Sequence, residues 1–356
     1  MRPIAWLAMT ILILTTAFND YPTFEDPGLE SVIRSALGAE AGYLTRTKLL
    51  RLTHLTAVGM DITSLVGLER CSSLEFLDLS ENQLFDLESL SNLSQLRILI
   101  LKSNRVTDIR PLAALEELVH LDLDFNFVTD VATLSELTNL QWLGMWNSGI
   151  RDITPLAQLA ELKELGLGGN PIQDTSPLEG LTKLEWLGLP NTGIERIAFL
   201  KNMKQLVKLS LGGNAIFDLS PLAELTQLKR LGLGSNDIVD VSQLANLLSL
   251  QQLSLWGNRI EDVSPLAGLT ELNRLWLDGN PISSVDIVRN MHELQILGLS
   301  QTPIESLGAL RANPGLGEDD EIDLRETALN LEPDSQARED IQALIDRGAV
   351  LLWDDF

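Results

Sequence analysis

One pattern recurs eleven times along this chain, from Leu74 to about Asn313, with a period of 22 residues and no insertion or deletion. Each copy starts with a leucine and carries an Asn, Ser or Thr eight residues later. The leucines are Leu74, Leu96, Leu118, Leu140, Leu162, Leu184, Leu206, Leu228, Leu250, Leu272 and Leu294. The polar residues are Asn82, Asn104, Asn126, Ser148, Asn170, Thr192, Asn214, Asn236, Asn258, Asn280 and Thr302. Because a fixed period of this length marks a stack of repeated units, it constrains the fold more than any other feature.

Each copy predicts a short strand followed by a turn. In one copy, Leu209 and Leu211 place their side chains on one face of the strand and Ser210 on the other. Asn214 follows the strand and is expected to bond the backbone of neighbouring turns, because buried backbone groups need partners. Asp218 stands before a Pro-containing turn, where a carboxylate caps free N–H groups. The return leg is therefore predicted to be irregular or 3₁₀, not a full helix.

Seven positions in each copy are apolar, and only Thr175 and Asn313 break this pattern across the eleven copies. No single copy can bury its own leucines, so the copies must stack. At roughly 4.8 Å per strand, the stacked strands span on the order of 50 Å. We therefore predict an α/β solenoid, a leucine-rich repeat horseshoe over residues 74–315 with a parallel sheet on its concave side. A helical N-terminal cap and a C-terminal cap are expected to close its two ends.

The first residues are typical of a secretory signal peptide covering residues 1–17. Arg2 precedes an apolar run from Ile4 to Leu14, and a small-residue site for cleavage follows at Ala17. The run is too short to span a bilayer comfortably, although an uncleaved anchor is the alternative. No other apolar run lies outside the repeats, so no stable membrane span is expected after signal removal. We expect an extracytoplasmic protein, either secreted or periplasmic.

Residues 18–73 are predicted to form the N-terminal cap. Asp26 is placed as the N-cap of a helix, Pro27 as its first residue and Gly38 as its stop, and a second helical turn is expected at Thr45. A degenerate copy in register with the array follows. Its apolar residues are Leu52, Leu55, Ala57, Met60, Ile62, Leu65 and Leu68. Such a cap covers the open end of the repeat core.

Residues 316–356 are predicted to form the C-terminal cap. An acidic loop comes first, and residues 322–324 then add one strand, three residues late relative to the repeat. Residues 335–347 form an amphipathic helix whose inward side chains are expected to be Ala337, Ile341, Leu344 and Ile345. Residues 350–353 are expected to pair with the last strand, because an open sheet edge invites aggregation.

The N-terminal cap and the repeats together resemble a known family. Phe24, Asp26-Pro27, Leu29 and Ile33-Arg34, followed by Ala36-Leu37-Gly38, Leu52, Leu55 and Gly67-Leu68-Glu69, are similar to the cap of internalin-type leucine-rich repeat proteins. The 22-residue units resemble the same family and also the cytosolic regulatory subunit of protein phosphatase 1. Cap and signal peptide together favour the bacterial, secreted class. The resemblance implies a binding protein. Attachment to a cell wall is not expected, because the sequence shows no LPxTG motif and no immunoglobulin-like module after the repeats.

Composition and motifs argue against several function classes. Lys and Arg number 26 and Asp and Glu number 50, for a net charge of −24, which disfavours nucleic acid and anionic membranes as partners. No catalytic, metal-binding or cofactor-binding motif is present, and the cluster Glu318–Asp323 lacks EF-hand spacing. Cys71, the only cysteine, falls on a core position and is expected to be buried. We predict no enzyme, metal or cofactor.

The residues beside the strand leucines are predicted to form the binding surface. Of seven Trp, five fall on this one face, where the leucine core does not need them, and exposed aromatic clusters mark interaction sites. The candidate binding residues are Phe76, His120, Phe125, Trp142, Trp146, Trp186, Lys208, Arg230, Trp256, Arg274 and Trp276. Trp142 and Trp186 share a column two strands apart, hence about 10 Å apart. The alternative is that these rings only shield strand backbone.

Three functions remain open at this point. The first is an internalin-like protein that holds a protein partner on its concave face. The second is carbohydrate binding, with Trp rings stacking on sugar faces above a floor formed by Gly212, Gly232 and Gly234. The third is a scaffold, either in an envelope assembly or, if the chain is not exported, as a phosphatase 1 regulator. The oligomeric state and the identity of the ligand do not follow from the sequence.

Overall fold

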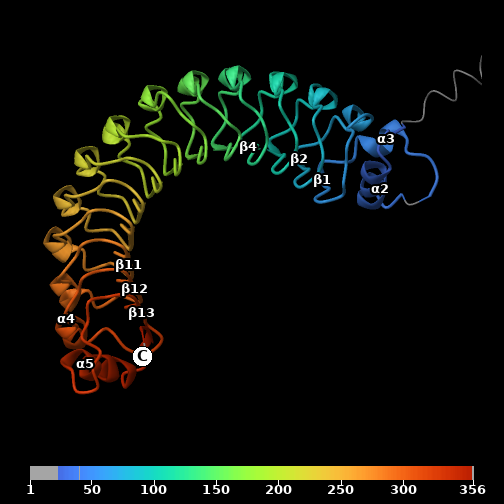
Figure 1. Cartoon of the computed structure of the whole chain (residues 1–356). Helices are drawn as coiled ribbons and strands as arrows, with labels where there is room; N and C mark the ends of the chain where they lie inside the picture. Colours follow the sequence, from blue (N-terminus) through green and yellow to red (C-terminus); the bar gives the residue numbers. More distant parts are fainter. Residues whose placement is uncertain (1–22, 40, 355–356) are drawn as a thin grey trace, which may run out of the picture. The chain divides into compact units, whose positions relative to one another are not determined.

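The protein is described by a computed structural model that covers residues 23–39 and 41–354 (Figure 1). The predicted signal peptide lies outside these residues. The chain divides into a unit that ends at Leu162 and a unit that begins at Lys163, and each is described by itself. Within each unit, short helical turns line one side of the repeats and strands line the other (Figure 1). No helix among the described residues has the length and apolarity needed to cross a membrane.

The first unit begins with two cap helices, α2 (Pro27–Ala36) and α3 (Arg46–Leu49). Its strands are β1 (His54–Thr56), β2 (Phe76–Asp78), β3 (Ile98–Ile100), β4 (His120–Asp122) and β5 (Trp142–Gly144). Its 3₁₀ helices are η1 (Leu68–Arg70), η2 (Glu88–Leu90), η3 (Arg110–Leu112), η4 (Ala132–Glu136) and η5 (Thr154–Gln158).

The second unit continues the alternation of strand and 3₁₀ helix and ends in two α-helices. Its strands are β6 (Glu164–Gly166), β7 (Trp186–Gly188), β8 (Lys208–Ser210), β9 (Arg230–Gly232), β10 (Gln252–Ser254), β11 (Arg274–Trp276), β12 (Ile296–Gly298), β13 (Glu321–Asp323) and β14 (Val350–Leu352). Its helices are η6 (Ser176–Leu178), η7 (Ala198–Asn202), η8 (Ser220–Leu222), η9 (Ser242–Leu244), η10 (Ser264–Gly268), η11 (Asp286–Asn290), α4 (Gly308–Ala312) and α5 (Gln336–Ile345).

The strands of each unit are parallel and pair in chain order, with a register set by the repeat. Phe76 faces Ile98 in the first unit and Lys208 faces Arg230 in the second, so each pair is offset by 22 residues. From β1 to β12 the central leucine of each strand is buried, and the first residue of the strand is less buried, as in the pattern of His120, Leu121 and Asp122. The predicted leucine-rich repeat solenoid with its parallel sheet is confirmed.

The return legs are 3₁₀ helices, as predicted, and an aspartate caps many of them. The Asp218 carboxylate accepts a hydrogen bond from the Ser220 backbone N–H at 2.9 Å, and Asp152 accepts one from Thr154 at 2.9 Å. These bonds lower the pKa of both carboxyls, in Asp218 mainly through the backbone and in Asp152 mainly through the hydroxyl. A 3₁₀ helix leaves its first N–H groups unpaired, so this aspartate satisfies a donor that the helix itself cannot.

The asparagines form a ladder that ties neighbouring repeats together. The side-chain amide of Asn126 donates to Leu123 O at 3.1 Å and to Leu101 O of the preceding repeat at 2.9 Å. Its Oδ1 accepts from the Val106 backbone N–H at 3.0 Å. Asn126 is almost fully buried, so each of these bonds satisfies a backbone group that water does not reach. The predicted structural role of the repeated asparagine is confirmed.

The N-terminal cap is fastened to the first repeats through Asp26. One carboxylate oxygen accepts from the N–H groups of Gly28 and Leu29 and thereby caps α2. The other oxygen accepts from the backbone N–H of Thr63 at 2.9 Å, which joins the helix to the degenerate copy. Burial alone would raise the pKa of Asp26, but these hydrogen bonds outweigh it and the pKa lies below its ordinary value. Met60 was expected in the core of that copy, but its side chain is 45% exposed.

The C-terminal cap follows the prediction except at one residue. Glu321 of β13 faces Ile296 of β12, an offset of 25 residues, which is the expected shift of three. In α5, Asp340 is buried and pairs with Arg311 of α4 at 2.8 Å, while Ile345 is 41% exposed, contrary to the prediction. The buried face of α5 is formed by Ala337, Asp340, Ile341 and Leu344, and Ile345 at the end of the helix lies outside it. The strand β14 pairs in parallel with β13, as expected.

Cys71 takes the predicted core position and is fully buried. Burial, together with the nearby Glu69 charge, raises the pKa of its thiol to about 12. Such a thiol is inert as a nucleophile at neutral pH, because the thiolate is the reactive form.

Candidate binding surface

We call the side of the sheet that points away from the leucine core the sheet face. In each repeat it is formed by the first and third residues of the strand and by the residue two positions after the strand. These side chains are intermediate or exposed in most repeats, whereas the strand leucines are buried. The sheet face is therefore the part of each repeat whose side chains vary without disturbing the core.

In the first unit, aromatic rings stack along neighbouring strands of the sheet face. The His120 and Trp142 rings are parallel, with centroids 4.1 Å apart and planes inclined by 7°. His54 and Phe76 stack less closely, at 5.9 Å and 18°. The Trp142 ring also lies over Gly144, where an added Cβ would collide with it. Burial lowers the pKa of His120, because it disfavours the charged form of the ring.

Carboxylates of the same unit lie beside these rings. Burial raises the pKa of Asp122 to about 6, and the charges of Asp124 and Asp78 add to this, although a hydrogen bond from Asp124 N–H and the charge of Lys102 oppose it. Burial also raises the pKa of Asp124, whose carboxylate accepts a bond from the Trp146 backbone N–H at 2.8 Å. The predicted negative charge at this end of the face therefore decreases as pH falls through about 6, where Asp122 takes up a proton.

Phe125 lies at the border of the sheet face. It occupies a turn with a φ of 57°, directly before the buried ladder residue Asn126, and its side chain is 47% exposed. The Lys102 ammonium stands 5.7 Å from the centroid of its ring, within reach of a cation–π interaction. The same turn position has a positive φ in other repeats, for example at Ser103 and Asn147, so this conformation belongs to the repeat scaffold.

In the second unit, a shallow pocket of about 270 Å³ lies on the strands β7–β11. Its lining includes Trp186, Lys208, Ser210, Arg230, Gly232 and Trp276. Two of the predicted aromatic residues and two of the predicted basic residues therefore line one hollow. Lys208 and Arg230 are neighbours in register, so their positive charges stand side by side.

The floor of glycines is only partly bare. An added Cβ at Gly232 would meet no atom closer than 3.7 Å, so this glycine is open. At Gly234, however, the indole of Trp256 occupies the space that a Cβ would need. The expectation that Gly234 forms bare floor is wrong, because the side chain of the next repeat folds back over it. The Trp256 ring is nevertheless 49% exposed.

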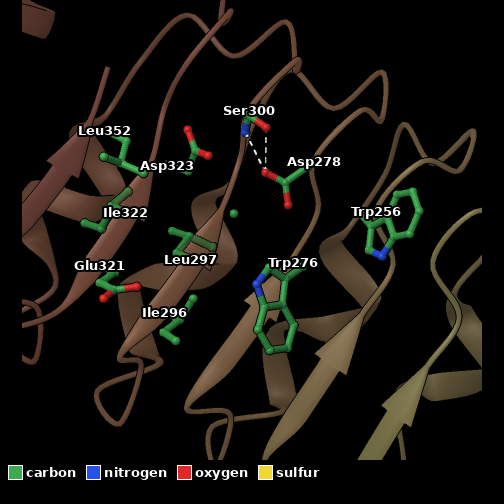
Figure 2. A pocket seen from close by; sticks show the side chains of 11 residues that line it. Trp256, Trp276, Asp278, Ile296, Leu297, Ser300, Glu321, Ile322, Asp323 and Leu352 are labelled. Atoms are coloured by element: carbon green, nitrogen blue, oxygen red, sulfur yellow. Dashed lines mark hydrogen bonds between the residues drawn. The ribbon is translucent and has the colours of Figure 1, made fainter. Parts of the chain in front are cut away.

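A second pocket, of about 400 Å³, lies where the repeats meet the C-terminal cap. Figure 2 shows Trp256 and Trp276 on one side of it and the residues of β13 on the other. Its polar lining includes Asp278, Glu321 and Asp323. One oxygen of Asp278 accepts bonds from the backbone N–H and the hydroxyl of Ser300, at 3.0 and 2.8 Å.

Eight of the eleven candidate residues lie on strands of the sheet face, and the other three lie just beyond strands. In the first unit, the His120 ring stacks on the Trp142 ring. Trp146 lies two residues after the end of β5, in the same repeat as Trp142. In the second unit, the two pockets gather Trp186, Lys208, Arg230, Trp256 and Trp276. Arg274 neighbours Ile296 in register but lines neither pocket. The spacing between Trp142 and Trp186 stays a prediction.

The sequence interpretation missed the acidic side of the second pocket. Glu321 and Asp323 occupy the same register positions on β13 as Ile296 and Gly298 on β12. The shift of three residues at the cap hides this continuity from a search with a fixed period. Following the sheet-face positions into the extra strand, which the sequence did predict, would have found both carboxylates.

No group of His, Cys, Asp and Glu within residues 23–39 and 41–354 is arranged to hold a metal ion. The acidic loop before β13 is a set of turns instead. Asp320 accepts a bond from the Gly317 backbone N–H at 2.8 Å and thereby helps close the loop.

Comparison with known proteins identifies the family. A family model described as leucine rich repeats (2 copies) matches residues 94–136 and 226–268. A crystal structure of the internalin inlF from Listeria monocytogenes is 33% identical in sequence, with a TM-score of 0.74 over 82% of this chain and 94% of that one. The chain belongs to the internalin-type leucine-rich repeat proteins. The resemblance of its cap and repeats to internalins is thereby confirmed.

More distant structures share only the leucine-rich repeat fold. A leucine-rich repeat protein of Leptospira interrogans is 24% identical, with a TM-score of 0.73 over 81% of this chain and 74% of that one. The plant peptide hormone receptor RGFR1, in complex with RGF2, is 20% identical, with a TM-score of 0.62 over 88% of this chain and 61% of that one. A search of curated proteins gave no match.

Proposed function

We propose that this internalin-type protein binds a protein partner through its sheet face and catalyses no reaction. The observation that carries the proposal is the set of aromatic rings on that face. The leucines complete the core without them, and Trp256 leaves about half of its surface exposed, 49%. Exposed Trp side chains are the type most enriched at the energetic centres of protein interfaces.

Charge supports a protein partner over a polyanion. The chain carries a net charge of −24, yet Lys208 and Arg230 stand together beside Trp186 in a shallow pocket. A face with separate acidic and basic parts matches a protein surface with the opposite pattern, and such complementarity sets orientation and partner choice. The leucine-rich repeat fold is compatible with this role, since the receptor RGFR1 is in complex with RGF2.

Export is part of the proposal. The charged start, the apolar run and the small-residue site at residues 1–17 are typical of a cleaved signal peptide. An internalin-type chain with such a start would act outside the cytoplasm, secreted or periplasmic. If the chain is retained in the cytosol, the phosphatase-regulator interpretation of its repeats becomes the better one.

Carbohydrate binding is the second candidate. The pocket on β7–β11 combines Trp186 and Trp276 with the open Gly232, and the hydroxyls of Ser210 and Ser254 lie in its lining. A sugar ring stacks on an indole through its C–H face and bonds to hydroxyls at its edge. The two basic residues of this pocket, Lys208 and Arg230, argue against a glycan ligand, because a neutral sugar has no charge for them to bind.

Two experiments test the proposal. Immobilised full-length chain is offered a library of surface and secreted proteins and, in parallel, a glycan array, and saturable capture of a protein is expected. Binding confined to glycans would replace the protein partner with a sugar. Fractionation of cells that express the tagged full chain is expected to place a shortened product outside the cytoplasm; a full-length cytosolic product would contradict export.

A further inference from the structure

We propose that the pocket between β11 and β14 holds the cationic side chain of an arginine or lysine presented by a basic segment of the partner. This inference rests on the proposed protein-binding function and names the chemistry of one contact in it. The pocket is lined by two indoles and by carboxylates, and it takes up about 400 Å³, within the range of sites that bind small groups.

The aromatic wall of the pocket suits a flat or rounded cation. Trp276 ends β11 and Trp256 comes two residues after β10, and the two indoles lie on the same side of the pocket in Figure 2. The face of an indole carries negative charge density and attracts a guanidinium or ammonium group, and Trp is the best of the aromatic side chains for this. A guanidinium can also stack flat on the ring.

The carboxylates of the pocket have oxygens to spare, and Figure 2 shows Asp278 on the side of the indoles and Glu321 across the pocket on β13. Asp278 uses one oxygen for Ser300, while its other oxygen lies over Gly298 and has no hydrogen-bond partner among the described residues. The Glu321 side chain likewise has no hydrogen bond or ion pair within the part of the chain that the structure describes. A bound cation would therefore meet two carboxylates whose charges no other side chain compensates.

The third carboxylate is already paired. Asp323 receives two hydrogen bonds from the Arg325 guanidinium, at 2.9 and 2.6 Å, and this pairing holds its pKa below the ordinary value against the effect of burial. Asp323 therefore adds little net charge to the pocket.

The nearest basic residue of the sheet face does not fill the pocket. Arg274 is separated from Glu321 by the intervening strand position Ile296, and no ion pair joins them among the described residues. Arg274 also does not line the pocket. It is a positive charge in register with the pocket residue Ile296, so its removal should strengthen the binding of a cation.

The apolar lining favours the side chain of a protein over a free inorganic cation. Ile296, Ile322 and Leu352 contribute to the walls, and the Leu352 side chain is 49% exposed. The long methylene stems of Arg and Lys cover such surface while their charged heads reach polar partners. A neutral sugar would use the indoles but would leave the carboxylate charges without a counterion.

The test uses the full chain and a capped tripeptide, Gly-Arg-Gly, with a matched tripeptide in which citrulline replaces arginine. Citrulline has the shape of arginine without its charge. The indole N–H signals of Trp256 and Trp276, assigned by Trp256→Phe and Trp276→Phe variants, are followed by NMR. Saturable shifts of these two signals with the arginine peptide, and not with the citrulline peptide, are expected. Equal shifts with both peptides, or saturation by methyl glucoside alone, would overturn the proposal.

Variants locate the charge that is responsible. Glu321→Gln and Asp278→Asn should each lower the affinity for the arginine peptide about tenfold. The Asn side chain at position 278 keeps an oxygen that can accept the bond from Ser300. Glu271→Gln, at an exposed carboxylate outside the pocket, should leave affinity unchanged, and Arg274→Gln should increase it. Unchanged affinity in both pocket variants would assign the cation to another place and overturn the proposal.

The outcome is separable from that of the proposed function. A protein partner captured on the wild-type chain, with no response of the indoles to the arginine peptide, would remove only the cation pocket. A response to the arginine peptide, with no protein captured by the chain, would remove the proposed function and leave the pocket as a site for basic side chains.

Discussion

The Trp142 indole lies flat against the His120 imidazole of the neighbouring strand, with centroids 4.1 Å apart and planes inclined by only 7°. The ring also fills the space above Gly144, so it is held in one orientation before any partner arrives. A side chain that is already ordered loses less entropy on binding, which leaves more of its contact energy as affinity. The stack on the sheet face is therefore a preformed anchor, held by a histidine of the neighbouring strand and not by the leucine core.

The asparagine ladder predicts a clear difference in stability between a variant at a ladder position and a variant at an exposed position nearby. Asn214 donates to Leu189 O at 2.9 Å and to Leu211 O at 2.8 Å, and accepts from Gly193 N–H at 2.9 Å. Asn214→Ala should lower the free energy of unfolding by about 1–3 kcal/mol, because these backbone groups lose their partner. Glu195→Ala, at an exposed carboxylate nearby, should cost less than about 0.5 kcal/mol. Equal urea midpoints for the two variants would show that the ladder does not stabilise the repeats.

Replacing Gly234, the glycine beneath the Trp256 ring, with alanine is predicted to move that ring without changing any charge. A methyl group at Gly234 would overlap the Trp256 indole, so Gly234→Ala should push the ring outward and change its fluorescence and its indole NMR signal. Gly180→Ala is the matched control, because a Cβ there meets no atom within 4 Å. An unchanged Trp256 signal in Gly234→Ala would mean that the ring does not rest on that glycine.

The raised pKa of Asp122 predicts that removing its charge stabilises the fold at neutral pH but not at low pH. Its pKa is about 6 in the folded protein against an ordinary 3.8, so the contribution of this carboxyl to stability is fully present below about pH 4 and is lost as pH rises through 6. Asp122→Asn should therefore stabilise the fold at pH 7.5, by roughly 1–2 kcal/mol after allowance for solvent screening, and should bring no gain at pH 4.

Thermal unfolding at the two pH values measures this difference. Glu136→Gln, at an exposed carboxylate of the same unit, serves as the control and should show no such gain at pH 7.5. The amide side chain of the Asp122→Asn variant would keep an oxygen for the Asp124 N–H, which now bonds the carboxylate at 2.9 Å, so the comparison isolates the charge. The account of Asp122 fails if the variant is destabilised at pH 7.5 or gains equally at both values.

Most of the fold could be predicted from the repeat period. Because the period is constant, the positions of the strands, the ladder asparagines and the capping aspartates follow from counting residues, and even the shift of three before β13 could be counted. The misplaced residues, Met60 and Ile345, lie in the two caps, where no repetition constrains which side chain turns inward. Amphipathic spacing alone did not reveal that Asp340 takes a buried place in α5 by pairing with Arg311.

The candidate site was only partly accessible to sequence reasoning. Counting positions gave the strand position of each Trp but not the place of its ring. The place of the ring depends on the space left by nearby glycines, such as Gly144 for Trp142 and Gly234 for Trp256. The raised pKa of Asp122 depends on burial and on charges from three repeats, which no local pattern contains. The second pocket needed the pairing of β13 with β12 before its acidic side could be seen.

The affinity of the chain for its captured protein partner, measured with and without the sheet-face aromatics, tests the central claim most directly. Trp142→Ala combined with Trp186→Ala should cost about 2 kcal/mol or more, roughly a thirtyfold loss of affinity, while circular dichroism shows the fold retained. Phe85→Ala combined with Phe217→Ala removes two aromatic side chains that are 64% and 58% exposed away from the strands, and should leave affinity unchanged. Wild-type affinity in the Trp variant, or an equal loss in the Phe variant, would contradict binding through the sheet face.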